Sequence, residues 1–168
     1  MKTTWFPEAV LALVCSLFLT LMGCGSDEDN PFVPTIPADE LRTAPTEIAL
    51  GDQEYGLETL LWRDFMPICP PDGEPLIALI HVVEQNGNPI APDLKLEYLW
   101  VIYGSKIWAT TFSDQSLPPP PPNELDRIAH EGPKWGPGVQ VDVVVGLRRG
   151  KGSLELLRAP DQWIDRTD

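Results

Sequence analysis

The stretch LKLEYLWVIY, from Leu94 to Tyr103, shows the clearest alternation of apolar and polar side chains in the chain. Every second residue is apolar, which predicts one shared face formed by Leu94, Leu96, Tyr98, Trp100 and Ile102. Lys95 and Glu97 fall on the opposite face. A repeat of two is the period of a β-strand and does not fit the period of a helix. The stretch therefore predicts a strand with one buried face.

Other short apolar runs on either side of this strand are also typical of β-structure. Val139–Leu147 (VQVDVVVGL) alternates in the same way, whereas Leu76–Glu84 (LIALIHVVE) is almost continuously apolar. The second pattern predicts a strand that is covered on both faces. Turn-forming residues separate the runs. Further strands are expected at Tyr55–Trp62, Lys106–Phe112, Ser153–Arg158 and Gln162–Ile164.

The connection from Leu117 to Gly138 is longer than the others and starts with five consecutive prolines, Pro118 to Pro122. Such a run adopts the polyproline II conformation. The residues that follow, Asn123 to His130, fit either a short helix capped by Asn123 or an edge strand. Both interpretations remain open from the sequence, and the role of the proline run is not decided by it.

Seven or eight short strands without a long helix resemble the immunoglobulin-like and fibronectin type III-like domains. Trp100 in a central strand and a closing hairpin fit this resemblance. The likeness concerns the fold alone, because the cysteine pair of the immunoglobulin family is absent from Leu76–Glu84 and Val139–Leu147. We therefore expect an all-β, immunoglobulin-like antiparallel β-sandwich over residues 47–168.

The segment before this domain has a different composition. The stretch from Gly25 to Thr46 is polar and acidic, contains four prolines and has no apolar periodicity. Such a composition does not support a packed core. Residues 24–46 are therefore expected to form a disordered, extended tether.

The first residues have the pattern of an export signal. Ala9 to Gly23 carries no charge, and its 15 residues are shorter than the about 20 that a membrane-spanning helix needs. The stretch Leu21-Met22-Gly23-Cys24 resembles the lipobox of bacterial lipoproteins. The resemblance implies a signal peptide at residues 1–23 and acyl chains, such as palmitate, attached through Cys24. Two or more chains give stable attachment to a membrane.

The residue after that cysteine bears on which membrane would hold the protein. In lipoproteins of Gram-negative bacteria an aspartate there favours retention at the inner membrane, and this chain has Gly25. The resemblance thus implies a location in the cell envelope, at the outer rather than the inner membrane if the source is Gram-negative.

Charge and cysteine content exclude some classes of function. The chain has 12 basic and 25 acidic residues, for a formal charge of -13. Such a charge disfavours binding to nucleic acid. After removal of the signal peptide, Cys69 is the one thiol of the expected domain, so no disulfide is expected within it. Whether that thiol is buried or reacts with a partner remains open.

No catalytic or cofactor-binding motif is present. The chain lacks HExxH, paired CxxC, GxSxG and dinucleotide-binding patterns. His81 lies in an apolar strand and is interpreted as structural, and His130 is expected to face solvent. We therefore expect no enzyme activity, metal or cofactor. The alternatives are an enzyme with His130 and Asp64 or Asp72 in one cleft, or a small-ligand carrier with an apolar pocket.

Basic and aromatic residues are the candidates for binding, and the alternatives are a turn that is charged for solubility and tryptophans that belong to the core. Arg148, Arg149 and Lys151 form a basic turn in an acidic chain, and with Trp135 they are the candidate partner surface. A second possibility is a surface formed by Pro118–Pro122 with three tryptophans, namely Trp108, Trp135 and Trp163. The expected function is a lipid-anchored envelope protein with a non-catalytic binding or structural domain. Its partner would be an envelope protein or a glycan, and the oligomeric state is not determined.

Overall fold

The computed structural model describes residues 32–115 and 117–168. Strands dominate this part, which confirms the predicted all-β class, and no described helix is long and apolar enough to cross a membrane. The predicted signal peptide and Cys24 lie outside the described residues. The elements are α1 (Ala38–Arg42), β1 (Glu47–Leu50), β2 (Gln53–Asp64), β3 (Leu76–Glu84), β4 (Leu94–Tyr103), β5 (Lys106–Thr110), β6 (Glu124–Gly132), β7 (Gln140–Arg149) and β8 (Glu155–Thr167).

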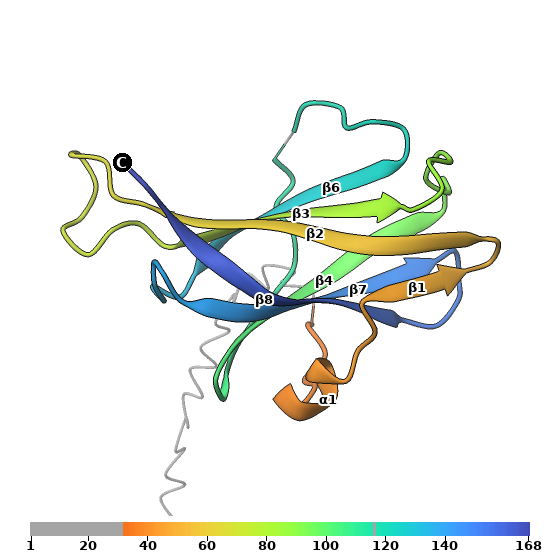
Figure 1. Cartoon of the computed structure of the whole chain (residues 1–168), viewed down its shortest axis with the longest axis horizontal. Helices are drawn as coiled ribbons and strands as arrows, with labels where there is room; N and C mark the ends of the chain where they lie inside the picture. The colour runs from red at the N-terminus through yellow and green to blue at the C-terminus, as the bar shows by residue number, and fades with distance from the viewer. Residues whose placement is uncertain (1–31, 116) are drawn as a thin grey trace, which may run out of the picture. The chain divides into compact units, whose positions relative to one another are not determined.

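The strands form two sheets that share β8 (Figure 1). Sheet A has the order β6-β3-β2, with β1 also paired to β2, and sheet B has the order β5-β4-β7-β8. The first part of β8 pairs antiparallel with β7, whereas Ile164–Thr167 pairs parallel with β2. The sequence predicted two short strands where β8 is continuous. Hairpins at β4–β5 and β7–β8 and crossovers between the sheets give an immunoglobulin-like sandwich.

The core lies between the two inner faces. Alternate residues of β7 point into it, as predicted, and they are Val141, Val143, Val145 and Leu147. Alternate residues of β3 also point inward, and they are Leu76, Ala78, Ile80 and Val82. The residues between them on β3 are only half-buried, so the prediction that this strand is covered on both faces is wrong.

A β-bulge in β4 contradicts the prediction that its five alternate residues share one face. The register of β4 against β7 shifts between Leu96 and Tyr98. A shift by one residue exchanges the faces of every residue that follows. Leu99 and Val101 therefore enter the core, and Trp100 packs on the outer side of sheet B.

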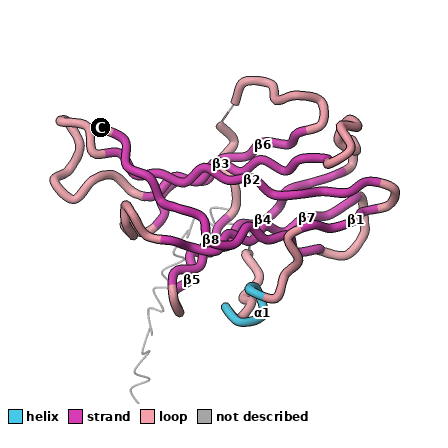
Figure 2. The backbone as a smooth tube through the Cα atoms, viewed as in Figure 1, coloured by secondary structure: helices cyan, strands magenta, loops and turns pink. Residues whose placement is uncertain are grey.

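The outer face of sheet B is covered by residues 33–44, which we call the covering segment. Leu41 and Ala44 of this segment are buried with Trp100, Ile102 and Val144 in a second apolar cluster. Figure 2 shows α1, in cyan, on the side of the molecule away from β3 and β6. The expected tether through residue 46 therefore differs from the structure. Apolar residues of sheet B remain outside the core, and the few apolar residues of the segment cover them.

Polar contacts add to this apolar packing. The indole Nε1 of Trp100 donates to the backbone oxygen of Pro34 at 3.2 Å. Arg42 Nε donates to Asp142 Oδ2 at 2.9 Å. Arg158 Nε donates to the backbone oxygen of Ala44 at 3.2 Å. The covering segment is thus joined to sheet B along its whole length.

The residues after the proline run form β6, an edge strand of sheet A. Of the two interpretations that the sequence left open, the edge strand is confirmed and the helix is wrong. The backbone N–H of Ser113 donates to the oxygen of Ile128 at 2.8 Å, so the connection after β5 lies along the outer edge of β6. A covered edge does not offer its backbone to other strands.

Candidate functional site

The residues of β6 present two different kinds of chemistry on its two sides. Glu124 and Asp126 alternate with Leu125 and Arg127, and successive side chains of a strand point to opposite sides. The first pair lies on the outer face of sheet A, next to a histidine. The second pair lines a groove beneath the proline-containing connection, and Asp126 also contributes to its lining. We call these two features together the β6 site.

On the outer face, β3 and β6 bring one imidazole to two carboxylates. The register places His81 opposite Asp126 and Val83 opposite Glu124. His81 Nδ1 lies 2.9 Å from Asp126 Oδ1, which is a hydrogen-bond distance. The side chains of His81 and Asp126 are 26% and 14% exposed. One ligand atom from each of His81, Glu124 and Asp126 lies within 4.8 Å of the other two.

This cluster stands on the regular part of the sheet and not on a loop. β3 is hydrogen-bonded to β2 on one side and to β6 on the other. Glu58 of β2 occupies the register position opposite His81, so a third carboxylate belongs to the same face. Cross-strand neighbours in such a row lie about 5 Å apart at Cβ. The backbone therefore fixes the spacing of these polar groups.

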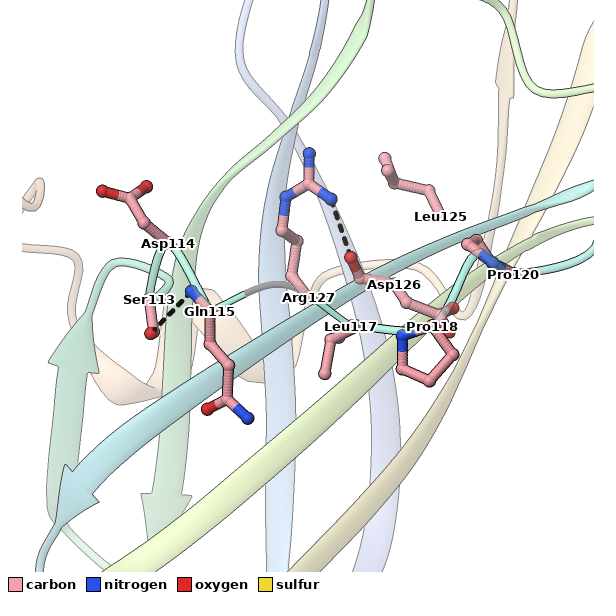
Figure 3. Close-up of a pocket in the computed structure, with 9 residues that line it drawn as sticks. All are labelled: Ser113, Asp114, Gln115, Leu117, Pro118, Pro120, Leu125, Asp126 and Arg127. Atoms are coloured by element: carbon pink, nitrogen blue, oxygen red, sulfur yellow. Dashed lines mark hydrogen bonds between the residues drawn. The ribbon is translucent and has the colours of Figure 1, made fainter.

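The groove on the other side of β6 has a volume of about 430 Å³. Figure 3 shows the connection contributing one wall and β6 the other. The lining residues are Ser113, Asp114, Gln115, Leu117, Pro118, Pro120, Leu125, Asp126 and Arg127. Arg127 Nη1 donates to the backbone oxygen of Asp126 at 2.8 Å. The backbone N–H of Gln115 donates to Ser113 Oγ at 3.1 Å.

The groove therefore combines a cation, a carboxylate, an amide and the apolar rings of prolines. Arg127 is exposed, so its remaining guanidinium N–H groups can meet a ligand. Prolines lower the freedom of the wall that they form, because their φ angle is fixed. Such a wall loses little entropy when a ligand binds. The arrangement suits a polar ligand that offers both donors and acceptors.

A buried carboxylate organises the loop that follows β3. Glu84 is 1% exposed, and its oxygens accept from the backbone N–H groups of Asn86 and Asn88 at 3.1 and 2.5 Å. Burial alone would raise the pKa of Glu84, but hydrogen bonds from Asn88 and Asn86 outweigh it and lower the pKa. The loop in turn reaches the proline run, because Ile90 N–H donates to the oxygen of Pro122 at 2.8 Å.

The structure does not bring the predicted partner surface together. Trp135 precedes β7, and Arg148 and Arg149 end it, so the length of this strand separates them by roughly 30 Å. Arg148 Nε binds the carboxylate of Glu97 at 3.0 Å. Arg149 Nε lies 3.4 Å from Asp93, and its Nη1 donates to the Leu50 oxygen at 2.8 Å. Lys151 is exposed.

The tryptophans predicted beside the prolines also lie elsewhere. Trp135 and Tyr103 have ring centroids 5.7 Å apart, and Trp135 packs against the core. Trp108 also packs against the core, where its ring adjoins Gly132 at the far end of β6. Trp163 is exposed. Trp108 and Trp135 therefore agree with the alternative that these tryptophans belong to the core, and they do not form one aromatic surface with Pro118–Pro122.

The residues suggested for an enzyme make separate contacts. His130 Nε2 lies 2.8 Å from Gln115 Oε1. Asp72 binds Lys134 at 2.8 Å, and this hydrogen bond with the lysine ammonium lowers the pKa of Asp72. Asp64 Oδ1 accepts from the N–H of Met66 at 3.0 Å. Among the described residues, one group of three has side-chain atoms close enough to bind a single metal ion, and it contains His81. His130, Asp64 and Asp72 do not belong to that group.

The single thiol of the domain is poorly suited to nucleophilic chemistry. Cys69 is half-buried in the loop between β2 and β3. Its pKa is raised, first by partial removal from water and then by the carboxylates of Asp64 and Glu74. A raised pKa keeps the thiol protonated, and the thiolate is the reactive form.

Sequence reasoning missed the role of Glu124 and Asp126. Part of this arrangement could be predicted, because a strand over residues 123–130 places Glu124 and Asp126 on the same face. The pairing of Asp126 with a histidine 45 residues away could not be seen in any local pattern. Comparisons with models of protein families, with curated proteins and with solved structures found no match for this chain.

Proposed function

We propose that the protein is a lipid-anchored protein of the cell envelope whose β-sandwich is a non-catalytic binding domain. The observation that carries the proposal is the groove along β6, where polar side chains and prolines line a cavity of about 430 Å³. Among the described residues that line the groove, no nucleophile is paired with a base, which is the pattern that covalent catalysis needs. A polar segment of an envelope protein, or a cell-wall glycan, has the chemistry that this groove would recognise.

The anchor is proposed from the sequence, at Cys24. With the covering segment beginning at residue 33, residues 25–32 would form the linker between the lipid and the folded part. Eight residues span at most roughly 28 Å when fully extended. The outer membrane is the proposed location in a Gram-negative cell.

The groove is tested by crosslinking in intact cells, followed by capture of the protein and its partners. We expect Arg127→Ala to lose a partner that the native chain retains, because the guanidinium is the cation of the groove. Lys106→Ala is the matched control, since it removes an exposed cation outside the groove. Equal capture by the native chain and Arg127→Ala would contradict a role for the groove.

The anchor is tested separately with Cys24→Ser. This variant should appear in the soluble fraction or remain unprocessed, and metabolic labelling with a fatty acid should fail. A Cys24→Ser chain that is labelled and sediments with membranes like the native chain would refute lipid attachment at this residue. Because the groove variant leaves Cys24 intact, failure of one proposal is distinguishable from failure of the other.

A further inference from the structure

We propose that His81, Asp126 and Glu124 form a binding site for a divalent transition-metal ion, with Zn²⁺ as the preferred ion. The site lies on the outer face of sheet A, where β3 and β6 pair. It shares Asp126 with the groove of the proposed function, whereas His81 and Glu124 do not line that groove. No local sequence motif predicts this site, because its ligands come from two strands that are distant in the sequence.

The distances suit replacement of a shared proton by a metal ion. His81 Nδ1 and Asp126 Oδ1 are 2.9 Å apart, and all three ligand atoms lie within 4.8 Å of one another. Ligands of a tetrahedral Zn²⁺ ion, with bonds of about 2.0–2.1 Å, are separated by about 3.4 Å. The pair therefore has to open by a few tenths of an ångström, and Glu124 has to move inward. Side-chain rotation alone supplies shifts of this size.

The donor types select the class of ion. An imidazole nitrogen with two carboxylates suits Zn²⁺ and related transition metals. Ca²⁺ and Mg²⁺ prefer oxygen ligands, and Ca²⁺ needs six to eight of them. Three protein ligands leave a position that water would fill, and Glu58 on the neighbouring strand adds negative charge on the same face. The carboxylates outnumber the imidazole, so a divalent cation offsets their repulsion.

A metal ion at this position would also have a structural effect. His81 belongs to the central strand β3, whereas Glu124 and Asp126 belong to the edge strand β6. The ion would therefore join the edge strand to the sheet by bonds additional to the backbone ladder. Any ligand that binds the folded chain and not the unfolded chain raises the temperature of unfolding.

The test uses the full-length chain in detergent, treated with a chelator and then dialysed. Zn²⁺ is titrated in competition with a coloured chelator, and the melting temperature is measured with and without Zn²⁺. We expect one Zn²⁺ per chain and a higher melting temperature. His81→Asn and Glu124→Gln should each weaken binding at least about tenfold and abolish the thermal shift. His130→Asn, which changes the other histidine, should behave like the native chain.

Circular dichroism of the metal-free variants shows whether each one folds, and Glu124→Gln keeps nearly the same side-chain volume at a half-buried position of the edge strand. Saturable Zn²⁺ binding that is lost in both ligand variants supports the site. Equal affinity in the native chain and in folded Glu124→Gln overturns it, as does the absence of saturable binding by the native chain. A thermal shift with Ca²⁺ as large as the shift with Zn²⁺ overturns the assignment to a transition metal.

Discussion

The outer faces of the two sheets differ in what lies on them. Sheet B presents Trp100, Ile102 and Val144, and the covering segment buries them. Sheet A presents Leu60, which is 47% exposed, and the polar cluster around His81. Among the residues that the structure describes, no helix or strand covers this second face. One face is therefore completed by the chain itself, and the other faces outward with groups that can bind.

The difference separates a face that contributes to stability, on sheet B, from a face that is available for binding, on sheet A. The largest cluster of apolar side chains on an outer face lies on sheet B, and the segment that leads to the proposed anchor covers it. The outer face of sheet A also carries apolar residues, such as Leu60, but its charged groups are solvated by water. The covered face should therefore be sensitive to mutation through stability, and the open face through binding.

The largest expected effect is at Trp100, which is 1% exposed beneath the covering segment. Trp100→Ala should lower the free energy of unfolding by about 3–5 kcal/mol, because it leaves a cavity and removes the donor to Pro34. Trp62→Ala, at a half-buried position on the outer face of sheet A, should cost about half as much or less. Urea unfolding measures the free energy of unfolding of both variants. Equal losses of stability would contradict the difference between the two faces.

A pair of leucines gives a second, smaller test. Leu41 of the covering segment is fully buried, so Leu41→Ala should cost about 2–4 kcal/mol. Leu60→Ala on the open face should cost less than about 1 kcal/mol, because much of that side chain already contacts water. If the two variants unfold at the same urea concentration, the segment does not cover sheet B in solution.

The loop that follows β3 in sheet A should respond to acid. The pKa of Glu84 is lowered from its ordinary value of 4.5 in the folded chain. Its stabilising contribution is therefore complete above pH 4.5 and is lost as the pH falls through the lower folded-state pKa. Glu84→Gln should be destabilised at pH 7, and its deficit relative to the native chain should shrink in more acidic buffer. Urea unfolding over a pH series measures this, and a constant deficit would contradict it.

The smallest effect concerns the polar contacts of the covering segment. Arg42→Ala removes the hydrogen bonds to Asp142 and to the Gly104 oxygen, and should cost about 1 kcal/mol. The loss is limited because Arg158 Nη1 also lies 3.5 Å from Asp142. Hydrogen exchange should show faster exchange in α1 and little change in β3. Equal changes in both elements would mean that the segment and sheet A unfold together.

Local patterns were enough to predict most strands. The bounds expected for Leu76–Glu84 and Leu94–Tyr103 agree with the structure, because apolar runs between turn residues mark both. The faces of β4 were less predictable. From Tyr98 to Ile102 every residue is apolar, so alternation cannot tell which side is inside, and a one-residue bulge decides it.

The site was harder to predict than the fold, because it depends on pairing between distant strands. His81 looks like a structural residue while its own strand is considered alone. Only the register with β6 places it beside Asp126. The contacts of the basic turn were unpredictable for a related reason, since Arg148 and Arg149 form ion pairs with carboxylates from other parts of the chain. The sequence gives the charged residues, and the pairing of the strands determines which of them form ion pairs.

The shared strand β8 has a consequence for how the chain reaches its folded state. Leu61 of β2 pairs with Ile164 of β8, across more than one hundred residues of sequence. Contacts between such distant residues form late and slow the folding of β-proteins. We expect the sandwich to remain open until β8 pairs with both sheets. A chain emerging from a ribosome would therefore close its core only after its last strand has been released.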